Sequence, residues 1–508
     1  MAQPLHTVHV RVNDAATGQP TPVRIQFTDE KGTYYAPFGR FREFATKPGM
    51  DVGGNLLFNN QRYAYIDGTC EIQLPSDRLF IQVHKGPEYE TVSEEMLLIP
   101  GQMAIRLEIK RWSNLRDEKW FPGDTNVALI SPHAALLEAA AEDLAVVNLL
   151  IMQVESREKL WDVDRLWYLP NLFAFSGQHP ALEKSGSMVV VNTYNYHPML
   201  TGLTLLNCHR VVYPLWFGEP MGFDNWTLED WCDQCHRKGG LVIWPPIDRL
   251  PPCATLFLGE PCADLALAKI DALEFNGTWE INPEIVEEWY GLLNLGFSLP
   301  LVGGSGKTSN EQLLGGWRTY ARLQPEEEFN YKNWIEAVRA GRTFATKGAL
   351  LMLTVNGEDP GAVIDIESPD QAVHVHAGVR RPFPPDRLEL IVNGKVVAES
   401  NSPDGSRLEL DVPMPVGGWI AAAYWGCDHN QGGFKLLAHT SPVYVQVPGR
   451  RPSPDLEAGK KLLKHFDEML EWVRNQARVE NEEQRKRLAR VFESAKEEVT
   501  KRLRAGQT

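Results

Sequence analysis

The first stretch of the chain alternates apolar and polar residues with a period of two. Runs such as HTVHVRV, PVRIQFTD and RLFIQVHKG are separated by Gly, Pro, Asn and Asp. Successive side chains of a strand point to opposite faces of a sheet, so this pattern is typical of antiparallel strands with one buried face. Residues 1–115 are therefore predicted to form an N-terminal domain that resembles a β-sandwich.

The pattern changes after Trp120. Segments with helical spacing then alternate with short, wholly apolar segments, as in AALLEAAAEDLAVVNLLIMQ, in TLEDWCDQCHRKGG followed by LVIWPP, and in EEWYGLLNLGFSLPLVGG. Helices that alternate with fully apolar strands are typical of a mainly parallel sheet or barrel. Residues 116–346 are predicted to form this α/β unit.

Two further units complete the chain. Residues 347–449 alternate again, in LLMLTVNGEDPG, RLELIVNGKVV and SPVYVQV, which predicts a second β domain. Residues 450–508 carry apolar side chains at helical spacing among dense mixed charge, which predicts a helical tail of one long helix or a hairpin of two. The apolar face of this tail would either pack on its own chain or join two copies into a homo-oligomer.

Composition narrows the class of protein. The 508 residues are 43% apolar and 23% charged, which is ordinary for globular domains and excludes a disordered or collagen-like chain. The 51 Lys and Arg residues against 66 Asp and Glu residues give a formal net charge of −15. A surface of that sign repels a phosphate backbone, so no nucleic-acid partner is expected.

The sequence also bears on the compartment. The first residues form no export signal, and no run approaches the ~18 apolar residues of a transmembrane helix. The seven Cys residues are scattered and odd in number, so a disulfide framework is not expected. These features favour a cytoplasmic location, unless a leader precedes this sequence.

Several short motifs admit a chemical and a plainer interpretation. CDQCH at 232–236 has the spacing of a c-type haem attachment site, but it falls on a predicted packed helix. GGSGKTS at 303–309 lacks the first glycine of a phosphate-binding loop. His374 and His376 share one side of a strand without a third metal ligand nearby in sequence. The plainer interpretation, a structural role, is preferred for all three.

Acidic residues near strand ends are weaker candidates. Asp264, Asp271 and Glu274 would serve acid–base chemistry only with a partner that the sequence does not reveal, so structural roles are preferred for them. The segment KWFPGDTNVALISP at 119–132 is more informative. Several metallohydrolase barrels keep a His-x-His pair after such a Gly-Asp, because alternate residues of a strand point together into the barrel mouth. Asn126 and Ala128 occupy those two positions here.

From this segment the chain resembles the CehA/McbA family of metallohydrolases, a branch of the polymerase-and-histidinol-phosphatase (PHP) superfamily. EKWFPGDTNVA resembles the family's G-W-Y-x-G-D-x-H-V-H entry to the barrel. The segments that follow in the family's order are AEDLAVVNLL, LTGLTLLNCHRVVYPL, CHRKGGLVIWPP, DLALAKIDALEF, WYGLLNLGFSLPLVGGSGK, GGWRTYA, NWIEAVRAGRTFATKGALLML and LLAHTSPVYVQV. The resemblance covers nearly the whole chain. It implies a PHP-like distorted (β/α) barrel between two β-sandwich-like domains, followed by the helical tail.

The resemblance also implies that the family's metal site is degenerate in this chain. The positions that carry or adjoin ligands in the family read Asn126, Ala128, Asn195, Gly202, Pro246 and Gly306. Ala, Gly and Pro side chains offer no donor, and a carboxamide is a weak ligand for a hard ion. A metal lowers the pKa of a bound water toward ~7 only when the cation is held. We therefore expect no metal cofactor and a pseudoenzyme retained as a binding or assembly scaffold.

Two alternatives stay open. The first is an active hydrolase of ester, amide, carbamate or phosphoester bonds, with a divalent metal such as Zn, Mn or Fe in a site rebuilt from His197 and His209. The candidate cleft residues are Asp124, His197, His209, Trp244, Asp248, Lys307 and Arg318. The second is a structural or interaction protein that uses its β domains and helical tail. The sequence does not identify the small ligand or the protein partner.

Overall fold

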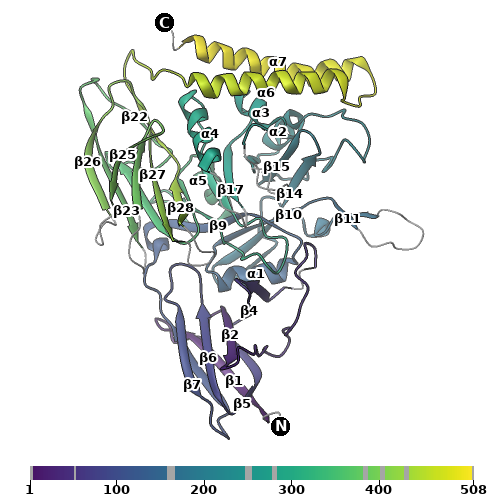
Figure 1. Ribbon diagram of the computed structural model, residues 1–508, viewed down its shortest axis with the longest axis vertical. Helices are drawn as coiled ribbons and strands as arrows, with labels where there is room; N and C mark the ends of the chain where they lie inside the picture. Colours follow the sequence, from purple (N-terminus) through teal and green to yellow (C-terminus); the bar gives the residue numbers. More distant parts are fainter. Residues whose placement is uncertain are drawn as a thin grey trace.

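The computed structural model describes residues 4–50, 53–156, 166–245, 255–276, 283–380, 387–400, 407–427 and 434–505. The chain is a mixed α/β protein of several domains, built mostly of strands (Figure 1). A large curled mixed sheet occupies its middle, smaller sheets flank it, and two long helices end the chain. Within the described residues, no helix is both long and apolar enough to cross a bilayer.

Two sheets form the N-terminal part. β1 (Leu5–Asp14), β5 (Thr69–Pro75) and β8 (Ala104–Ile109) make one sheet, and β2 (Val23–Asp29), β3 (Asn55–Phe58), β4 (Gln61–Ile66), β6 (Arg78–His84) and β7 (Val92–Leu97) make the other. Alternate residues such as Val8, Val10 and Val12 are fully buried and pack against Ile25 and Phe27 of the second sheet. The period-two pattern thus places one apolar face of each sheet in a shared core.

The central sheet contains nine strands of the middle segment. They are β9 (Trp120–Ala128), β10 (Val146–Ile151), β14 (Ser187–His197), β15 (Thr201–Leu206), β16 (Leu241–Trp244), β17 (Ala272–Asn276), β18 (Leu301–Gly304), β19 (Arg318–Arg322) and β20 (Thr343–Thr346), in the spatial order β18-β17-β16-β15-β14-β10-β9-β19-β20. The prediction of a mainly parallel sheet needs correction. The β9–β10, β10–β14, β16–β17 and β17–β18 pairs are parallel. β15 runs antiparallel to both of its neighbours, because a tight turn after His197 reverses the chain, and β19 runs antiparallel to both β9 and β20.

The sheet curls until its edge strand returns to β9. The residue after Gly306, Lys307, accepts a 2.7 Å hydrogen bond through its backbone oxygen from the N–H of Ala128. An isolated parallel bridge joins Val127 to the same Lys307. Side chains from β9, β17 and β18 are therefore brought together inside the curl.

Short helices cover the curled sheet. They are α1 (Pro132–Ala141), α2 (Leu228–Arg237), α3 (Pro261–Ala266), α4 (Pro283–Asn294) and α5 (Tyr331–Arg339), with the 3-10 turns η1 (Leu115–Glu118) and η2 (Leu172–Ala174). α2 begins at a reciprocal capping box between Thr227 and Asp230 and ends before Gly239, whose φ of 76° suits a helix C-terminus. Cys232 and Cys235 are fully buried on this helix, which supports the structural interpretation of the CDQCH motif.

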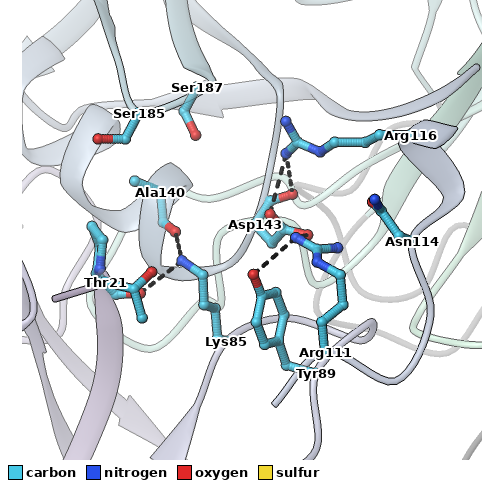
Figure 2. A pocket seen from close by; sticks show the side chains of 11 residues that line it. Thr21, Lys85, Tyr89, Arg111, Asn114, Arg116, Ala140, Asp143, Ser185 and Ser187 are labelled. Carbon is cyan, nitrogen blue, oxygen red and sulfur yellow. Dashed lines mark hydrogen bonds and ion pairs between the residues drawn. The ribbon is translucent and has the colours of Figure 1, made fainter. Parts of the chain in front are cut away.

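The N-terminal sheets meet the end of α1 through polar contacts. Arg24 on β2 forms a 2.7 Å ion pair with Glu142, and Lys85, directly after β6, donates 2.6 Å to the backbone oxygen of Ala140. Gly86 makes this approach possible, since a Cβ there would lie 2.3 Å from the backbone oxygen of Glu142. A pocket opens beside these contacts (Figure 2).

The second β region continues the large sheet instead of standing apart from it. Its strands are β21 (Leu350–Val355), β22 (Val363–Asp365), β23 (Ala372–Arg380), β24 (Arg387–Val392), β25 (Lys395–Ser400), β26 (Arg407–Pro413), β27 (Gly418–Cys427), β28 (Phe434–Thr440) and β29 (Val443–Gln446). β20 pairs with β28, which extends the central sheet through β27, β24 and β25. The separate sheet β21-β23-β26 shares an apolar core with this extension. Three short strands complete the set: β11 (Val154–Ser156) pairs with β12 (Leu166–Tyr168), and β13 (Leu182–Lys184) pairs with β14.

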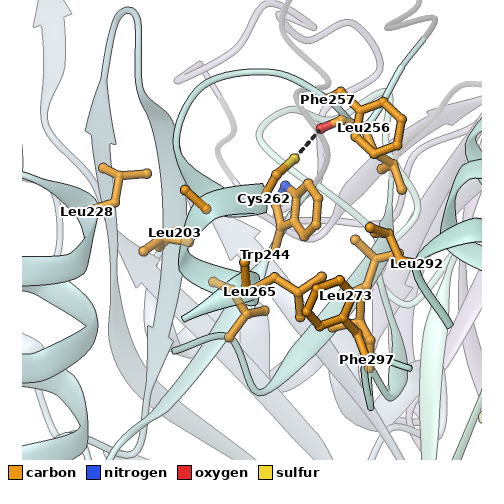
Figure 3. Packing of buried hydrophobic residues seen from close by; sticks show 14 of the residues in the cluster. Leu203, Leu228, Trp244, Leu256, Phe257, Cys262, Leu265, Leu273, Leu292 and Phe297 are labelled. Carbon is orange, nitrogen blue, oxygen red and sulfur yellow. Dashed lines mark hydrogen bonds between the residues drawn. The ribbon is translucent and has the colours of Figure 1, made fainter. Parts of the chain in front are cut away.

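The tail is a hairpin of two helices, α6 (Leu456–Asn475) and α7 (Glu482–Ala505), which lies across the helices of the central region (Figure 1). Its apolar side chains, among them Leu462, Phe466 and Val491, are buried in one cluster with residues of α3, α4 and β17. Figure 3 shows part of this cluster, around Trp244 and Leu273. The tail therefore packs its apolar face on its own chain.

Candidate functional site

Three side chains converge on the carboxylate of Glu274 inside the curled sheet. Thr125 Oγ1 donates to its Oε2 at 2.5 Å, and Asn126 Nδ2 donates to its Oε1 at 2.8 Å. Asn276 Nδ2 donates to the same Oε1 at 2.9 Å. Thr125 and Asn126 come from β9, whereas Glu274 and Asn276 alternate along β17 and therefore lie on one face of that strand. We call these four residues the Glu274 cluster.

Gly304 makes the convergence possible. β18 pairs with β17 and borders β9, so it lies between the two strands that supply the cluster. A Cβ at Gly304 would lie 2.7 Å from Thr125 Oγ1, 2.8 Å from Asn126 Cβ and 2.9 Å from Glu274 Oε2. The missing side chain leaves the space in which β9 and β17 bond to each other across β18.

The environment of Glu274 favours its protonated form. The residue is fully buried, and burial raises the pKa of its carboxyl to about 7, although the hydrogen bonds from Thr125, Asn126 and Asn276 oppose the shift. All three of these partners are neutral. The carboxyl therefore titrates near neutral pH, which is the range suited to proton transfer or to a pH-dependent hydrogen bond.

Asp124 holds the neighbouring backbone. Its Oδ1 accepts from the backbone N–H groups of Asn126 at 3.0 Å and Ser305 at 2.9 Å, and its Oδ2 accepts from that of Gly315 at 2.8 Å. Burial raises the pKa of Asp124, while these hydrogen bonds act in the opposite direction. The side chain thus ties β9 to the loop after β18 and to the segment before β19.

The two cations expected in the cleft are engaged elsewhere. The buried Lys307 donates through Nζ to the backbone oxygens of Ser309 and Gln312, each at 3.0 Å, and lies 3.4 Å from a carboxylate oxygen of Glu138 on α1. Arg318 donates to the backbone oxygen of Gly315 at 2.9 Å and to that of Glu142 at 2.9 Å. Both side chains brace loops around α1, which is a structural role.

The two histidines expected to rebuild a metal site are not brought together. His197 is buried, donates through Nε2 to Asp224 Oδ1 at 2.9 Å, and accepts at Nδ1 from two backbone N–H groups of the following turn. Burial lowers its pKa. His197 lies opposite Thr201 at the turn of the hairpin, whereas His209 lies beyond the far end of β15, a strand about 17 Å long. His209 is exposed and bonds to the backbone oxygen of Lys238.

Three further positions at which the resemblance expects metal ligands carry residues with a structural role in this chain. Asn195 Nδ2 donates to the backbone oxygens of Val212 at 2.9 Å and Pro214 at 3.0 Å. Gly202 faces Tyr194, whose hydroxyl oxygen would lie 2.5 Å from an added Cβ. Gly306 has a φ of 64°, a conformation that favours glycine.

The other residues expected at the site also have no role in the Glu274 cluster or lie outside the described residues. Ala128 is buried and contributes a backbone N–H to the closure of the sheet at Lys307. Trp244 is buried in the apolar cluster of Figure 3 and does not line a polar cleft. Pro246 and Asp248 lie outside the described residues.

The described residues do not fit a tightly held divalent metal. Among them, no group of three or more His, Cys, Asp or Glu side chains is arranged to hold an ion. The Glu274 cluster offers one carboxylate, and that carboxylate already accepts from a hydroxyl and two amides. Amide and hydroxyl groups beside a neutralisable carboxyl suit hydrogen bonding to a polar ligand better than metal coordination.

Three members of this arrangement were missed at the level of sequence. Asn126 and Glu274 were candidates separately, but Thr125, Asn276 and Gly304 were not. The alternation of Glu274 and Asn276 in ALEFN was a readable sign of a shared strand face.

Comparisons of this chain with protein-family models, with curated proteins and with solved structures each returned no match.

Proposed function

We propose that this chain is a pseudoenzyme built on a PHP-like metallohydrolase scaffold, which binds a ligand without metal-dependent hydrolysis. The observation that carries the proposal is the hydrogen bond from Asn126 to Glu274. Asn126 stands where the resemblance expects the first metal-binding histidine, and its side chain bonds to a carboxyl group of the chain itself. A hydrogen-bonded cluster thus takes the place of the ligand cage.

The sheet topology supports the barrel part of the proposal. Seven strands, from β9 through β10, β14, β15, β16 and β17 to β18, are consecutive neighbours, and the bridge between Val127 and Lys307 links the two ends of the series. We assign residues 116–346 to this barrel. The proposed ligand is a small polar molecule that exchanges hydrogen bonds with Asn126 and Asn276, the two half-buried members of the Glu274 cluster.

Metal content and metal add-back test the proposal directly. Protein purified without chelator is analysed by inductively coupled plasma mass spectrometry, and thermal melting is recorded with added Zn, Mn and Fe. We expect substoichiometric metal and a melting shift under about 2 °C for both the wild type and Glu274→Gln. Near one equivalent of metal, with a stabilisation that Glu274→Gln removes, would overturn the proposal.

One observation favours the active-hydrolase alternative. The pKa of about 7 at Glu274 lies in the range of a general acid or base. Turnover assays on ester, amide, carbamate and phosphoester substrates therefore belong beside the metal analysis. Turnover that follows a group titrating near pH 7, and that Glu274→Gln abolishes, would replace the pseudoenzyme with a hydrolase whose acid–base residue is Glu274.

The structure of the helical tail gives little support to the alternative of an interaction protein. The apolar faces of α6 and α7 are buried against the central region and against each other. A partner that used those faces would first have to displace the tail from its own chain. Light scattering of the full chain, with a monomer mass as the expected result, tests this point.

A further inference from the structure

A pocket of about 290 Å³ lies where the N-terminal sheets meet the end of α1 (Figure 2), and no residue of the Glu274 cluster lines it. Its wall includes Lys85, Tyr89, Arg111, Arg116, Asp143 and Ser187. The floor residues Lys85, Asp143 and Ser187 are buried, whereas Ser185 on the rim is exposed. The volume lies just below the range of roughly 300–1,000 Å³ found for small-molecule sites, so the pocket suits a compact ligand.

The lining of this pocket carries an excess of positive charge. Three cations, Lys85, Arg111 and Arg116, share one lining carboxylate, that of Asp143. Asp143 lies 2.8 Å from an Arg111 nitrogen and 3.2 Å from an Arg116 nitrogen. Two further acids stand behind the wall. Glu88 lies 3.3 Å from Arg111, and Asp14 accepts from the hydroxyl of Tyr89 at 3.1 Å.

Lys85 and Arg116 both keep donor capacity. An ammonium group has three N–H donors, and that of Lys85 donates to the backbone oxygens of Pro22 at 2.8 Å and Ala140 at 2.6 Å, which leaves one. Arg116 donates from both terminal nitrogens, to the backbone oxygens of Gly186 and Asp143 and to the carboxylate of Asp143. Its Nε is buried without a hydrogen-bond partner among the described residues. A buried cationic donor left unpaired is costly, so a ligand acceptor at this point would be stabilising.

We propose that this pocket binds a phosphate group, either as inorganic phosphate or at the end of a small phosphomonoester. A tetrahedral dianion offers several acceptor oxygens to an ammonium and two guanidinium groups at once, and guanidinium–phosphate pairs are among the stronger hydrogen bonds in proteins. The site draws on the segment after β6, the segment around η1 and the end of α1, and so holds two parts of the chain together. It is independent of the Glu274 cluster and of the proposed function.

The protonation of Lys85 gives the site a recognisable pH dependence. Burial, together with the nearby Arg111 and Arg116 and against the opposing charges of Asp143 and Asp14, lowers the pKa of Lys85 to about 8. A bound dianion favours the charged ammonium, so phosphate binding takes up a proton when the solution is above that pKa. Affinity is then expected to weaken as the pH rises from 7 to 9.

Isothermal titration calorimetry of the full chain tests this site with inorganic phosphate and with glycerol phosphate, at constant chloride concentration. We expect saturable binding with a Kd below about 1 mM for at least one of the two probes. Arg116→Gln should weaken binding about tenfold or more, whereas the matched control Arg106→Gln, on the exposed face of β8, should leave it unchanged. Tighter binding of glycerol phosphate would identify a phosphomonoester site, and tighter inorganic phosphate an enclosed ion site.

A second variant guards against misfolding of the first. Lys85→Met removes one cation and should both weaken phosphate binding and abolish the loss of affinity between pH 7 and 9. Absence of saturable binding to the wild type would overturn the proposal. So would equal affinities of the wild type and a folded Arg116→Gln or Lys85→Met variant. Metal add-back plays no part in these measurements, so failure here and failure of the proposed function are distinguishable.

Discussion

The amide nitrogen of Asn126 donates 2.8 Å to the carboxyl group of Glu274, 148 residues further along the chain. The contact passes over Gly304, where an added Cβ would lie within 2.9 Å of atoms from both β9 and β17. We expect Gly304→Ala to lower the free energy of unfolding by about 1–3 kcal/mol, because overpacking forces its neighbours apart. Urea unfolding monitored by tryptophan fluorescence measures this loss.

A double-mutant cycle locates the origin of that loss. Thr125→Ala removes the oxygen nearest to the added methyl group, so the double variant should be more stable than the sum of the two single changes predicts. Strict additivity would mean that the strain arises elsewhere on β18.

Local patterns predicted the elements well because their causes are local. α2 was readable from its apolar spacing and from the glycine at its end. The alternation in RLELIVNGKVV indicated strands, and β24 and β25 pair there around Asn393 and Gly394, both of which adopt positive φ. The antiparallel insertion of β15 was not readable, since buried strands look alike whichever way they run.

The cluster itself depends on long-range geometry. Asn126 and Glu274 meet only because the sheet curls until the segment after β18 returns to β9, and no local pattern encodes that closure. The pairing of His197 with His209 fails for a different reason, because His197 lies at the turn of the β14–β15 hairpin and the whole of β15 separates it from His209. Lys307 and Arg318 were expected in a cleft because the resemblance places them at polar positions of the family, whereas in the structure they donate to backbone oxygens.

The pH dependence of stability reports on Glu274. Between the ordinary glutamate pKa of 4.5 and about 7, the folded chain holds a proton that the unfolded chain has lost. Stability contributed by this group therefore falls as the pH rises through that interval and is level above it, a change of about 3 kcal/mol. The measurement is the free energy of unfolding of the wild type minus that of Glu274→Gln at several pH values. Parallel profiles for the two proteins would contradict the shifted pKa.

The buried ion pair between Arg24 and Glu142 should be sensitive to the loss of one partner. Its atoms lie 2.7 Å apart with side chains 8% and 1% exposed, and Tyr65 donates to the same carboxylate oxygen at 3.1 Å. Arg24→Met leaves the buried carboxylate of Glu142 without its cation, with only the neutral Tyr65 hydroxyl beside it. We therefore expect a loss of about 3–5 kcal/mol in the free energy of unfolding.

Two comparisons make the ion-pair measurement specific. Arg78→Met, which breaks a 2.8 Å pair with Glu95 whose side chains are both 53% exposed, should cost no more than about 1 kcal/mol. Adding Glu142→Leu to Arg24→Met should recover part of the loss, since the unpaired charge is then gone. Equal costs for Arg24→Met and Arg78→Met would show that burial does not govern the first pair.

The packing of the tail is testable with two identical substitutions on one helix. Leu462 is fully buried in the cluster formed with α3 and α4, whereas Leu456, at the start of the same helix, is 48% exposed. Leu462→Ala should lower the free energy of unfolding by about 2–5 kcal/mol and Leu456→Ala by no more than about 0.5 kcal/mol. Packing on the same chain also requires that the denaturation midpoint stay constant over a roughly tenfold range of protein concentration, because a dimer interface would shift it by mass action. Equal effects of the two substitutions would contradict the burial of Leu462, and a midpoint that rises with concentration would point to a second copy of the chain.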